Sequence, residues 1–483
     1  MSLRFFNTLT RKIGDFEPLH PGRVGMYACG PTVYRPPHVG NYRSFVFYDI
    51  LHRYLESKGL DVKFVMNLTD VEDKIIQAAH EQGVRIGDVT SPMIDAFLDD
   101  LRILAIRPAD VYPRATDSID SMIALIAQLV ERGHAYVRDG SVYFAIASLP
   151  SYGKLSRIDM QEIRSGAGLA TRDRSAIDAD EYAKEDARDF ALWKGAKDVD
   201  RAVGAVWPTP WGEGRPGWHI ECSAMSMAEL GETFDIHTGG EDLIFPHHED
   251  EIAQSEGATG KPFVRHWLHV KHLLVNGEKM SKSKRNDYKL NELLERGYTP
   301  AAIRYLLLSA HYRKELNFTF EGLDDAQAAL RRVVDFADRL DASPAAAAIS
   351  SSLPAIASAA RAAFEAALDD DLNTPEALAA LFKFVREANA ELDRRSSVSD
   401  GDLTAARDAL RRMDDVLGFI DLARTHARDV DADFAQWVQD RINERQAARG
   451  RRDFAAADAI RSELTAAGVV LEDTPSGPRW KKA

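Results

Sequence analysis

The chain has only two cysteines, Cys29 and Cys222, and they lie in the strings ACGPT and HIECSAM. A third string, FPHHEDE, places His247 and Glu251 four residues apart, which puts both side chains on one face if the segment is helical. Two thiolates, an imidazole and a carboxylate make a four-ligand set that suits zinc. These residue types therefore raise metal binding as the first hypothesis.

Spacing alone does not select the ligands within FPHHEDE, because His248 and Glu249 are equal candidates beside His247. The long separation between the two cysteines also lacks the local C-x-x-C pattern that makes a zinc site specific. Two buried free thiols are the simpler interpretation, and a disulfide is disfavoured in a large cytoplasmic protein. The residues by themselves leave these interpretations open.

Two further strings are suited to phosphate. In HVGN (His38–Asn41), Gly40 permits close backbone approach, and the amino terminus of a following helix attracts anions. KMSKS (Lys279–Ser283) offers two lysines as mobile point charges and two serine hydroxyls as donors. Either string alone also fits an ordinary turn, but the two together are a much stronger signal.

Together the two strings resemble the HIGH and KMSKS signatures of class I aminoacyl-tRNA synthetases, which bracket ATP. The resemblance implies that His38 and Asn41 face the ATP phosphates from one side, while Lys279 and Lys282 approach on a mobile loop from the other. It also implies catalysis by positioning and by charge stabilisation at the α-phosphate, with Mg²⁺ accompanying ATP. The chain departs from the signatures at two places: Asn41 replaces the second histidine, and Lys284–Arg285 follow KMSKS where a glycine is common.

Longer strings resemble the cysteinyl-tRNA synthetase family within that class. They cover essentially the whole chain and include YACGPTVY, NLTDVEDKI, RDFALWK, GRPGWHIECSAM, FPHHEDE and AAIRYLLLSAHYR. The resemblance implies one zinc ion (Zn2+) held by Cys29, Cys222, His247 and Glu251. Because zinc is thiophilic, such a site would select the thiol of cysteine over the hydroxyl of serine without an editing domain.

The same resemblance implies the substrates and the residues around them. The substrates would be L-cysteine, ATP and tRNA(Cys), and the product would be cysteinyl-tRNA. Thr69 of NLTD would contact the thiol or the amine of cysteine, with a cap at the strand end as the alternative role. Trp218 would line the amino-acid pocket, with an ordinary core tryptophan as the alternative. Asp235, together with His237 and Gly239, is a candidate ribose or adenosine contact.

The elements that must position these residues begin with a strand–helix–strand unit. VGMYACG (24–30) and VKFVMNL (62–68) are short apolar runs that predict buried strands. Between them, apolar residues recur at helical spacing from Phe47 to Leu55, and Gly59 ends the helix. A βαβ unit predicts a doubly wound, Rossmann-like parallel sheet, whose ligands lie beyond the carboxyl ends of its strands. Both HVGN and NLTD follow such ends.

Changes in composition divide the rest of the chain, so the predicted fold class is an α/β catalytic domain with an insertion, a helical bundle and a small carboxy-terminal domain. We expect a catalytic domain in 1–130 and 215–265, a connective insertion in 131–214 with a polar stretch at 166–214, a KMSKS-containing segment in 266–320, a helical bundle in 321–425 and an anticodon-binding domain in 426–483.

The tail is basic although the chain carries a net charge of −14. Residues 441–483 contain nine Lys or Arg and six Asp or Glu, and Trp480 stands beside Lys481 and Lys482. An aromatic ring flanked by cations suits the stacked bases of single-stranded RNA. A solvated basic helix end is the alternative, but the tail resembles the family's anticodon-binding unit.

Composition excludes several classes of protein. With 45% hydrophobic and 28% charged residues, the 483-residue chain is neither disordered nor collagen-like. No apolar run reaches the ~18 residues of a membrane span, and the amino terminus lacks the apolar core of a signal peptide. We expect a cytoplasmic monomer.

Three rival functions remain: a mycothiol-type cysteine ligase, a zinc hydrolase and a structural zinc protein that binds RNA. The ligase would have no anticodon unit, the hydrolase gives no reason for KMSKS, and the structural protein gives none for HVGN.

Overall fold

The computed structural model describes residues 2–158, 189–280, 284, 286–343, 351–394, 398–451, 453–474 and 477–482. Of residues 426–432, 435 and 470–482 only the backbone is described. The chain divides into two compact units, Met1–Phe419 and Ile420–Ala483.

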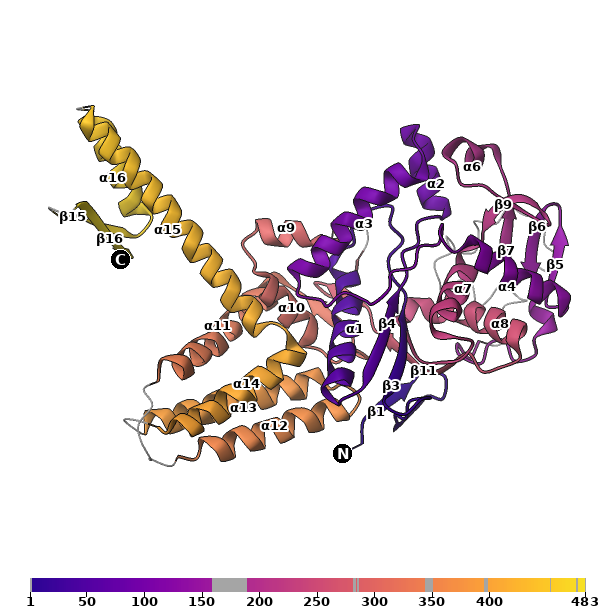
Figure 1. Cartoon of the computed structure of the whole chain (residues 1–483), viewed down its shortest axis with the longest axis horizontal. Helices are drawn as coiled ribbons and strands as arrows, with labels where there is room; N and C mark the ends of the chain where they lie inside the picture. The colour runs from indigo at the N-terminus through magenta and orange to yellow at the C-terminus, as the bar shows by residue number, and fades with distance from the viewer. Residues whose placement is uncertain are drawn as a thin grey trace. The chain divides into compact units, whose positions relative to one another are not determined.

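A four-stranded parallel sheet forms the centre of the first unit (Figure 1). Its strands run in the order β11 (Val264–Val270), β10 (Phe234–Gly240), β3 (Arg23–Ala28) and β4 (Asp61–Met66). In register, Met26 lies between Ile236 and Phe64, and all three side chains are fully buried. The second halves of β3 and β4 are apolar and buried, as expected where both faces of a parallel sheet are covered, and these runs predicted the two strands. The parallel-sheet fold class is confirmed.

Helices cover the sheet from both sides (Figure 1). The helix α1 (Val39–Ser57) lies on one side, and α7 (Trp218–Leu230) and α8 (His247–Thr259) lie on the other. After β4 the chain forms α2 (Asp73–Gln82), α3 (Ile86–Ile103) and α4 (Ile119–Glu131), and α4 packs against α7 and α8. The α1 and α8 helices both begin at the edge where the parallel strands end, so the sheet topology collects the predicted site residues there.

An antiparallel sheet is inserted between the strands of the parallel one. It has the order β5 (Ala135–Arg138), β6 (Ser141–Phe144), β7 (Phe190–Gly195), β9 (Gly212–Pro216) and β8 (Trp207–Thr209), with α6 (Asp198–Val203) after β7. Arg215 of β9 forms ion pairs with Asp200 of α6 and with Asp73 of α2, which docks the insertion onto the unit. Within the predicted polar stretch, residues 166–188 lie outside the described part.

A small three-stranded sheet carries the KMSKS string. Its order is β13 (Glu278–Lys279), β12 (Leu273–Val275) and β14 (Leu316–Phe318), and β12 pairs parallel with β14. The helices α9 (Leu290–Glu295) and α10 (Pro300–Leu308) connect β13 to β14. A separate hairpin of β1 (Arg4–Asn7) and β2 (Lys12–Asp15) precedes the main sheet.

The helical region consists of α11 (Phe320–Ala342), α12 (Leu353–Asp369), α13 (Thr374–Asp393) and α14 (Asp400–Leu417). Apolar residues recur every three or four positions in these helices, as at Leu323, Ala326 and Leu330, and they form the buried stripe. Side chains at the helix starts satisfy exposed backbone amides, as Ser399 does for Asp402. No helix in the described segments is both long and apolar enough to cross a membrane.

The second unit begins with α15 (Ile420–Gly450), a helix of 31 residues. It is followed by α16 (Phe454–Ala466) and by a hairpin of β15 (Val469–Thr474) and β16 (Gly477–Lys482). The core of this unit contains Val438, Ile442, Leu464 and Val469.

Candidate active site

The structure brings Cys29, Cys222, His247 and Glu251 together. Cys29 follows β3, Cys222 lies on α7, and the other two lie one turn apart on α8. Their donor atoms all lie within 4.8 Å of one another, and none of the four residues is more than 6% exposed. The Cys29 Sγ to Cys222 Sγ distance is 4.0 Å, the Cys29 Sγ to Glu251 Oε1 distance is 3.9 Å, and the His247 Nε2 to Glu251 Oε1 distance is 3.0 Å.

This geometry fits a tetrahedral metal ion. Bonds of about 2.0–2.3 Å place the donor atoms around zinc roughly 3.3–3.8 Å apart. The measured separations bracket that range, and two sulfurs in the set favour a soft or borderline ion over Mg²⁺ or Ca²⁺. A buried cluster of this composition is a candidate metal site.

The charges in the cluster are strongly coupled. The hydrogen bond with Cys29, together with His247, outweighs burial and Glu251 and lowers the pKa of Cys222 to about 6. Burial raises the pKa of Cys29 well above its usual range, and the hydrogen bond to Cys222 adds to this. Burial also lowers the pKa of His247, but Glu251 and Cys222 outweigh it and raise that pKa to about 10. Without a metal, these shifts favour a proton on Cys29 and on His247 and the ionised form of Cys222.

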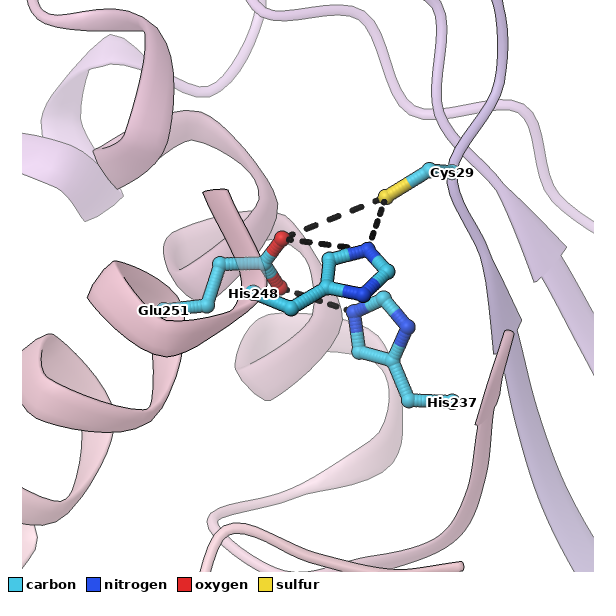
Figure 2. A group of neighbouring side chains, drawn as sticks. All are labelled: Cys29, His237, His248 and Glu251. Atoms are coloured by element: carbon cyan, nitrogen blue, oxygen red, sulfur yellow. Dashed lines mark hydrogen bonds and ion pairs between the residues drawn. The ribbon is translucent and has the colours of Figure 1, made fainter. Parts of the chain in front are cut away.

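A second group of donors overlaps the first: Cys29, His237, His248 and Glu251 (Figure 2). The His248 Nε2 lies 3.3 Å from the Cys29 Sγ, and the His237 Nε2 lies 2.7 Å from the Glu251 Oε2. Both imidazoles therefore contact atoms that belong to the first group. With a metal in the first group, they would orient its sulfur and carboxylate ligands, as outer partners of metal ligands commonly do.

Two histidines that the sequence analysis did not assign extend this arrangement. The His219 Nδ1 lies 2.9 Å from the His247 Nδ1, which leaves the His247 Nε2 facing Glu251. The His269 Nε2 lies 2.8 Å from the His248 Nδ1. Their strings, WHIEC and HVKH, do not show which side chains these histidines contact, so only the fold identifies their place beside the cluster.

The structure corrects two assignments made from the sequence. Glu249 is not a metal-ligand candidate, because its carboxylate accepts the backbone amides of Gly153, Leu155 and Ser156 at 2.9, 3.1 and 2.7 Å. Asp235 is not a ribose contact, because it is 3% exposed and accepts the amides of Leu19 and Gly25. Both carboxylates are used to hold neighbouring backbone in place.

His237, expected beside Asp235 as an adenosine contact, is fully buried in the second donor group instead. Gly239 lies against His248, because a Cβ at this position would lie 2.6 Å from the His248 Cε1. Both therefore adjoin the metal cluster.

Trp218 and Thr69 flank the cluster from two elements. The indole of Trp218, the first residue of α7, stacks on the His247 imidazole with ring centroids 4.3 Å apart. Thr69 is buried and pairs with Thr32, three residues beyond Cys29. A Cβ at Gly30 would lie 1.8 Å from the Asn67 carbonyl oxygen, so only glycine allows the two strand ends to approach this closely.

The HVGN and KMSKS strings are in contact. His38 caps α1: its Nδ1 accepts the Asn41 amide at 3.3 Å, and the Asn41 side-chain oxygen accepts the His38 amide at 3.0 Å. A Cβ at Gly40 would lie 2.6 Å from the Met280 Cε, so the methionine of KMSKS packs directly against the glycine of HVGN. Lys279 ends β13, whereas Lys282 lies outside the described residues.

Three family models match successive segments of the chain. The family model described as the tRNA synthetases class I (C) catalytic domain matches residues 15–328. A DALR domain matches residues 363–421, and the cysteinyl-tRNA ligase anticodon binding domain matches residues 431–480.

Whole proteins show the same relationship. The chain is 46% identical over 492 residues to the cysteine–tRNA ligase of Symbiobacterium thermophilum and 47% identical over 483 residues to that of Solibacter usitatus, and each alignment covers 100% of both chains. The solved Mycobacterium tuberculosis methionyl-tRNA synthetase with methionyl-adenylate has the same fold, with a TM-score of 0.57, 16% identity and coverage of 82% of this chain and 90% of that one. The chain thus belongs to the cysteinyl-tRNA synthetase family of class I aminoacyl-tRNA synthetases.

Proposed function

We propose that this chain carries out the cysteine–tRNA ligase reaction of its family with the buried donor cluster and the HVGN and KMSKS strings described above. L-cysteine and ATP form cysteinyl-adenylate and pyrophosphate, and the cysteinyl group then passes to the 3′ end of tRNA(Cys). The observation that carries this proposal is the juxtaposition of a buried two-sulfur metal cluster with a helix amino terminus suited to phosphate. The first recognises a thiol and the second binds ATP.

The metal in this proposal is a single Zn²⁺ held by Cys29, Cys222, His247 and Glu251. When bound there, it supplies a thiophilic Lewis acid that distinguishes the thiol of cysteine from the hydroxyl of serine. Trp218 closes the amino-acid pocket beside His247, which its indole already stacks upon. Thr69 holds the substrate from the opposite strand end.

ATP lies between α1 and the KMSKS string in this proposal. His38 and Asn41 contact the phosphates from the α1 side, and the capping box holds both in position. Lys279 and Lys282 contribute positive charge from the other side, and Mg²⁺ accompanies the nucleotide. The residues act by alignment and by charge stabilisation at the α-phosphate while the adenylyl group is transferred and pyrophosphate leaves, without a covalent enzyme intermediate.

The carboxy-terminal unit is proposed to read the anticodon. Phe454 begins α16 with 62% of its surface exposed, and Arg449 and Arg451 precede it at the exposed end of α15. An exposed aromatic ring next to cations can stack on an unpaired base, and the arginines can contact phosphates. We place anticodon reading in residues 426–483 and the catalytic chemistry before residue 320. Residues 321–425 form the helical connection between these two parts. In this proposal the chain acts as a cytoplasmic monomer.

The test combines zinc content with cysteine-dependent pyrophosphate exchange. We expect about one zinc per chain, exchange with cysteine but not with serine, and charging of tRNA(Cys). Cys222→Ser should lower the zinc content and raise the KM for cysteine. Full zinc in a Cys29→Ser, Cys222→Ser double variant would refute the metal site. Full-length protein that activates cysteine but charges no tRNA would refute the assignment as a cysteine–tRNA ligase.

A further inference from the structure

Arg43 lies on α1 just after HVGN, and only 2% of its surface is exposed. Its Nη1 donates to the carbonyl oxygens of Lys271 at 2.9 Å and His272 at 2.5 Å. Its Nη2 donates to the carbonyl oxygen of His311 at 3.2 Å and to that of Lys314. One guanidinium thus binds four backbone carbonyls in two segments that are about 40 residues apart in the sequence.

These two segments are the base of the sheet that carries KMSKS. Lys271 and His272 immediately precede β12, and Lys314 lies two residues before β14. In that sheet β12 lies between β14 and β13, and Leu274 is paired with Lys279. Arg43 therefore ties the HVGN helix to both parallel strands on which the KMSKS string is built.

The other end of the KMSKS segment is attached to the same helix. The Val39 amide donates to the Tyr288 carbonyl at 2.8 Å, and the backbones of His38 and Lys289 pair in an isolated antiparallel β-bridge. Met280 packs on Gly40 between these two attachments. The segment between β13 and α9 consequently starts and ends at positions that α1 determines.

Charge pairing does not explain why the Arg43 side chain is buried. Among the described residues it forms no ion pair, and burial lowers its pKa to about 10 in spite of the charges of Glu241 and Glu315. Burying a cation among carbonyls alone is unfavourable compared with leaving it in water. A planar group with five donors is, however, the side chain best able to join four carbonyls at fixed positions.

We propose that Arg43 is a positioning residue of the adenylation step: it sets the distance between the HVGN half and the KMSKS half of the ATP site. The inference rests on the proposed function, because it concerns the same ATP site. Two loops that stabilise charge at the α-phosphate during one adenylyl transfer must be held to within a fraction of an ångström. Arg43 holds them without contacting the nucleotide.

Arg304 provides a matched control. It is fully buried, donates to the carbonyl oxygens of Leu417 at 2.7 Å and Leu104 at 3.1 Å, and is paired with Asp49, also on α1. It therefore ties α1 to other segments through backbone carbonyls and, unlike Arg43, a buried ion pair, but those segments carry no residue of the ATP site. Arg304→Met should lower the melting temperature and leave the KM for ATP and the kcat of pyrophosphate exchange unchanged.

The experiment compares full-length wild type, Arg43→Met, Arg43→Lys and Arg304→Met below their melting temperatures. For Arg43→Met we expect kcat/KM for ATP to fall roughly 10²-fold, with unchanged zinc content and unchanged KM for cysteine. Arg43→Lys, which keeps the charge but can bind fewer carbonyls, should show a smaller loss and serves as the test variant if Arg43→Met does not fold.

The outcomes separate this inference from the proposed function. Wild-type protein without cysteine-dependent exchange would refute the function itself. Given an active wild type, a selective loss in ATP parameters for the Arg43 variants supports the positioning role. Normal ATP parameters in a folded Arg43→Lys, or equal losses in Arg43→Met and Arg304→Met, would show that Arg43 is only a structural contact.

Discussion

Zinc uptake by the metal-free protein should release about two protons at pH 7. The pKa of Cys222 is lowered to about 6 by the hydrogen bond from Cys29, so this ligand is already a thiolate. Burial raises the pKa of Cys29, and Glu251 and Cys222 raise that of His247 to about 10, so each of these two carries a proton at pH 7. Both must lose it to bind a metal.

The sign and size of the pH dependence follow from this count. Because binding releases protons, the apparent zinc affinity must increase with pH, and two protons correspond to roughly a 100-fold increase per pH unit near neutrality. Below pH 6 Cys222 is protonated as well, so the count should increase toward three. Glu251 contributes nothing, because His237 and His247 outweigh its burial and hold its pKa at about 2.

Isothermal titration calorimetry in buffers of different ionisation enthalpy directly measures the number of protons released per zinc ion bound. The alternative donor group of Cys29, His237, His248 and Glu251 leaves His247 protonated, so its count is lower by the His247 proton. A count of one or less at pH 7, or an affinity that does not change with pH, would therefore refute the assignment of His247 as a ligand.

Further predictions concern the ATP loop, the carboxy-terminal unit and acid stability. Lys282→Ala should slow adenylate formation by roughly 10²–10³-fold with unchanged zinc content. Near-normal pyrophosphate exchange in this variant would show that KMSKS is only a basic turn without a catalytic role. A chain ending at Leu422 should keep pyrophosphate exchange and lose tRNA charging, and undiminished charging would exclude the tail as the anticodon reader. Burial, together with Arg265, lowers the pKa of His266 to about 4, whereas an unfolded histidine has a pKa of about 6.5. As the pH falls, the unfolded chain therefore binds this proton before the folded chain does. The free energy of unfolding consequently decreases between about pH 6.5 and pH 4. His266→Phe should reduce the loss of unfolding free energy between pH 7 and pH 5 by about 1–2 kcal/mol in urea titrations, and an unchanged difference would contradict a buried neutral imidazole.

The sequence was informative wherever chemistry or periodicity is local. The apolar runs at 24–30 and 62–68 predicted two neighbouring parallel strands, because strands covered on both faces must be apolar along their length. HVGN was expected where a helix starts, and His38 and Asn41 do cap α1. The composition after residue 320, rich in Ala, Leu, Asp and Arg, predicted the helical bundle, and the structure shows the amphipathic stripes that let such helices pack.

Local pattern could not assign roles within FPHHEDE or FDIHTGG. Spacing on a helix says which side chains share a face, but not what that face meets. Glu249 turns out to bind the backbone at 153–156, and Asp235 binds two amides from the start of the chain. These partners lie about 100 or more residues away, so no sequence window contains both sides of either interaction.

The sequence by itself determined which residues are chemically able to bind a thiophilic metal and a nucleotide, and which family they resemble. Only the tertiary structure decided that Cys29 and Cys222, 193 positions apart, have sulfurs 4.0 Å from each other, and that two histidine-containing groups share Cys29 and Glu251. It alone revealed that Arg43 joins carbonyls that precede both parallel strands of the KMSKS sheet. The physical reason is that every residue has a backbone carbonyl, so the packing of the chain decides which carbonyls a guanidinium contacts. The amino-acid sequence therefore contains no pattern that predicts these partners.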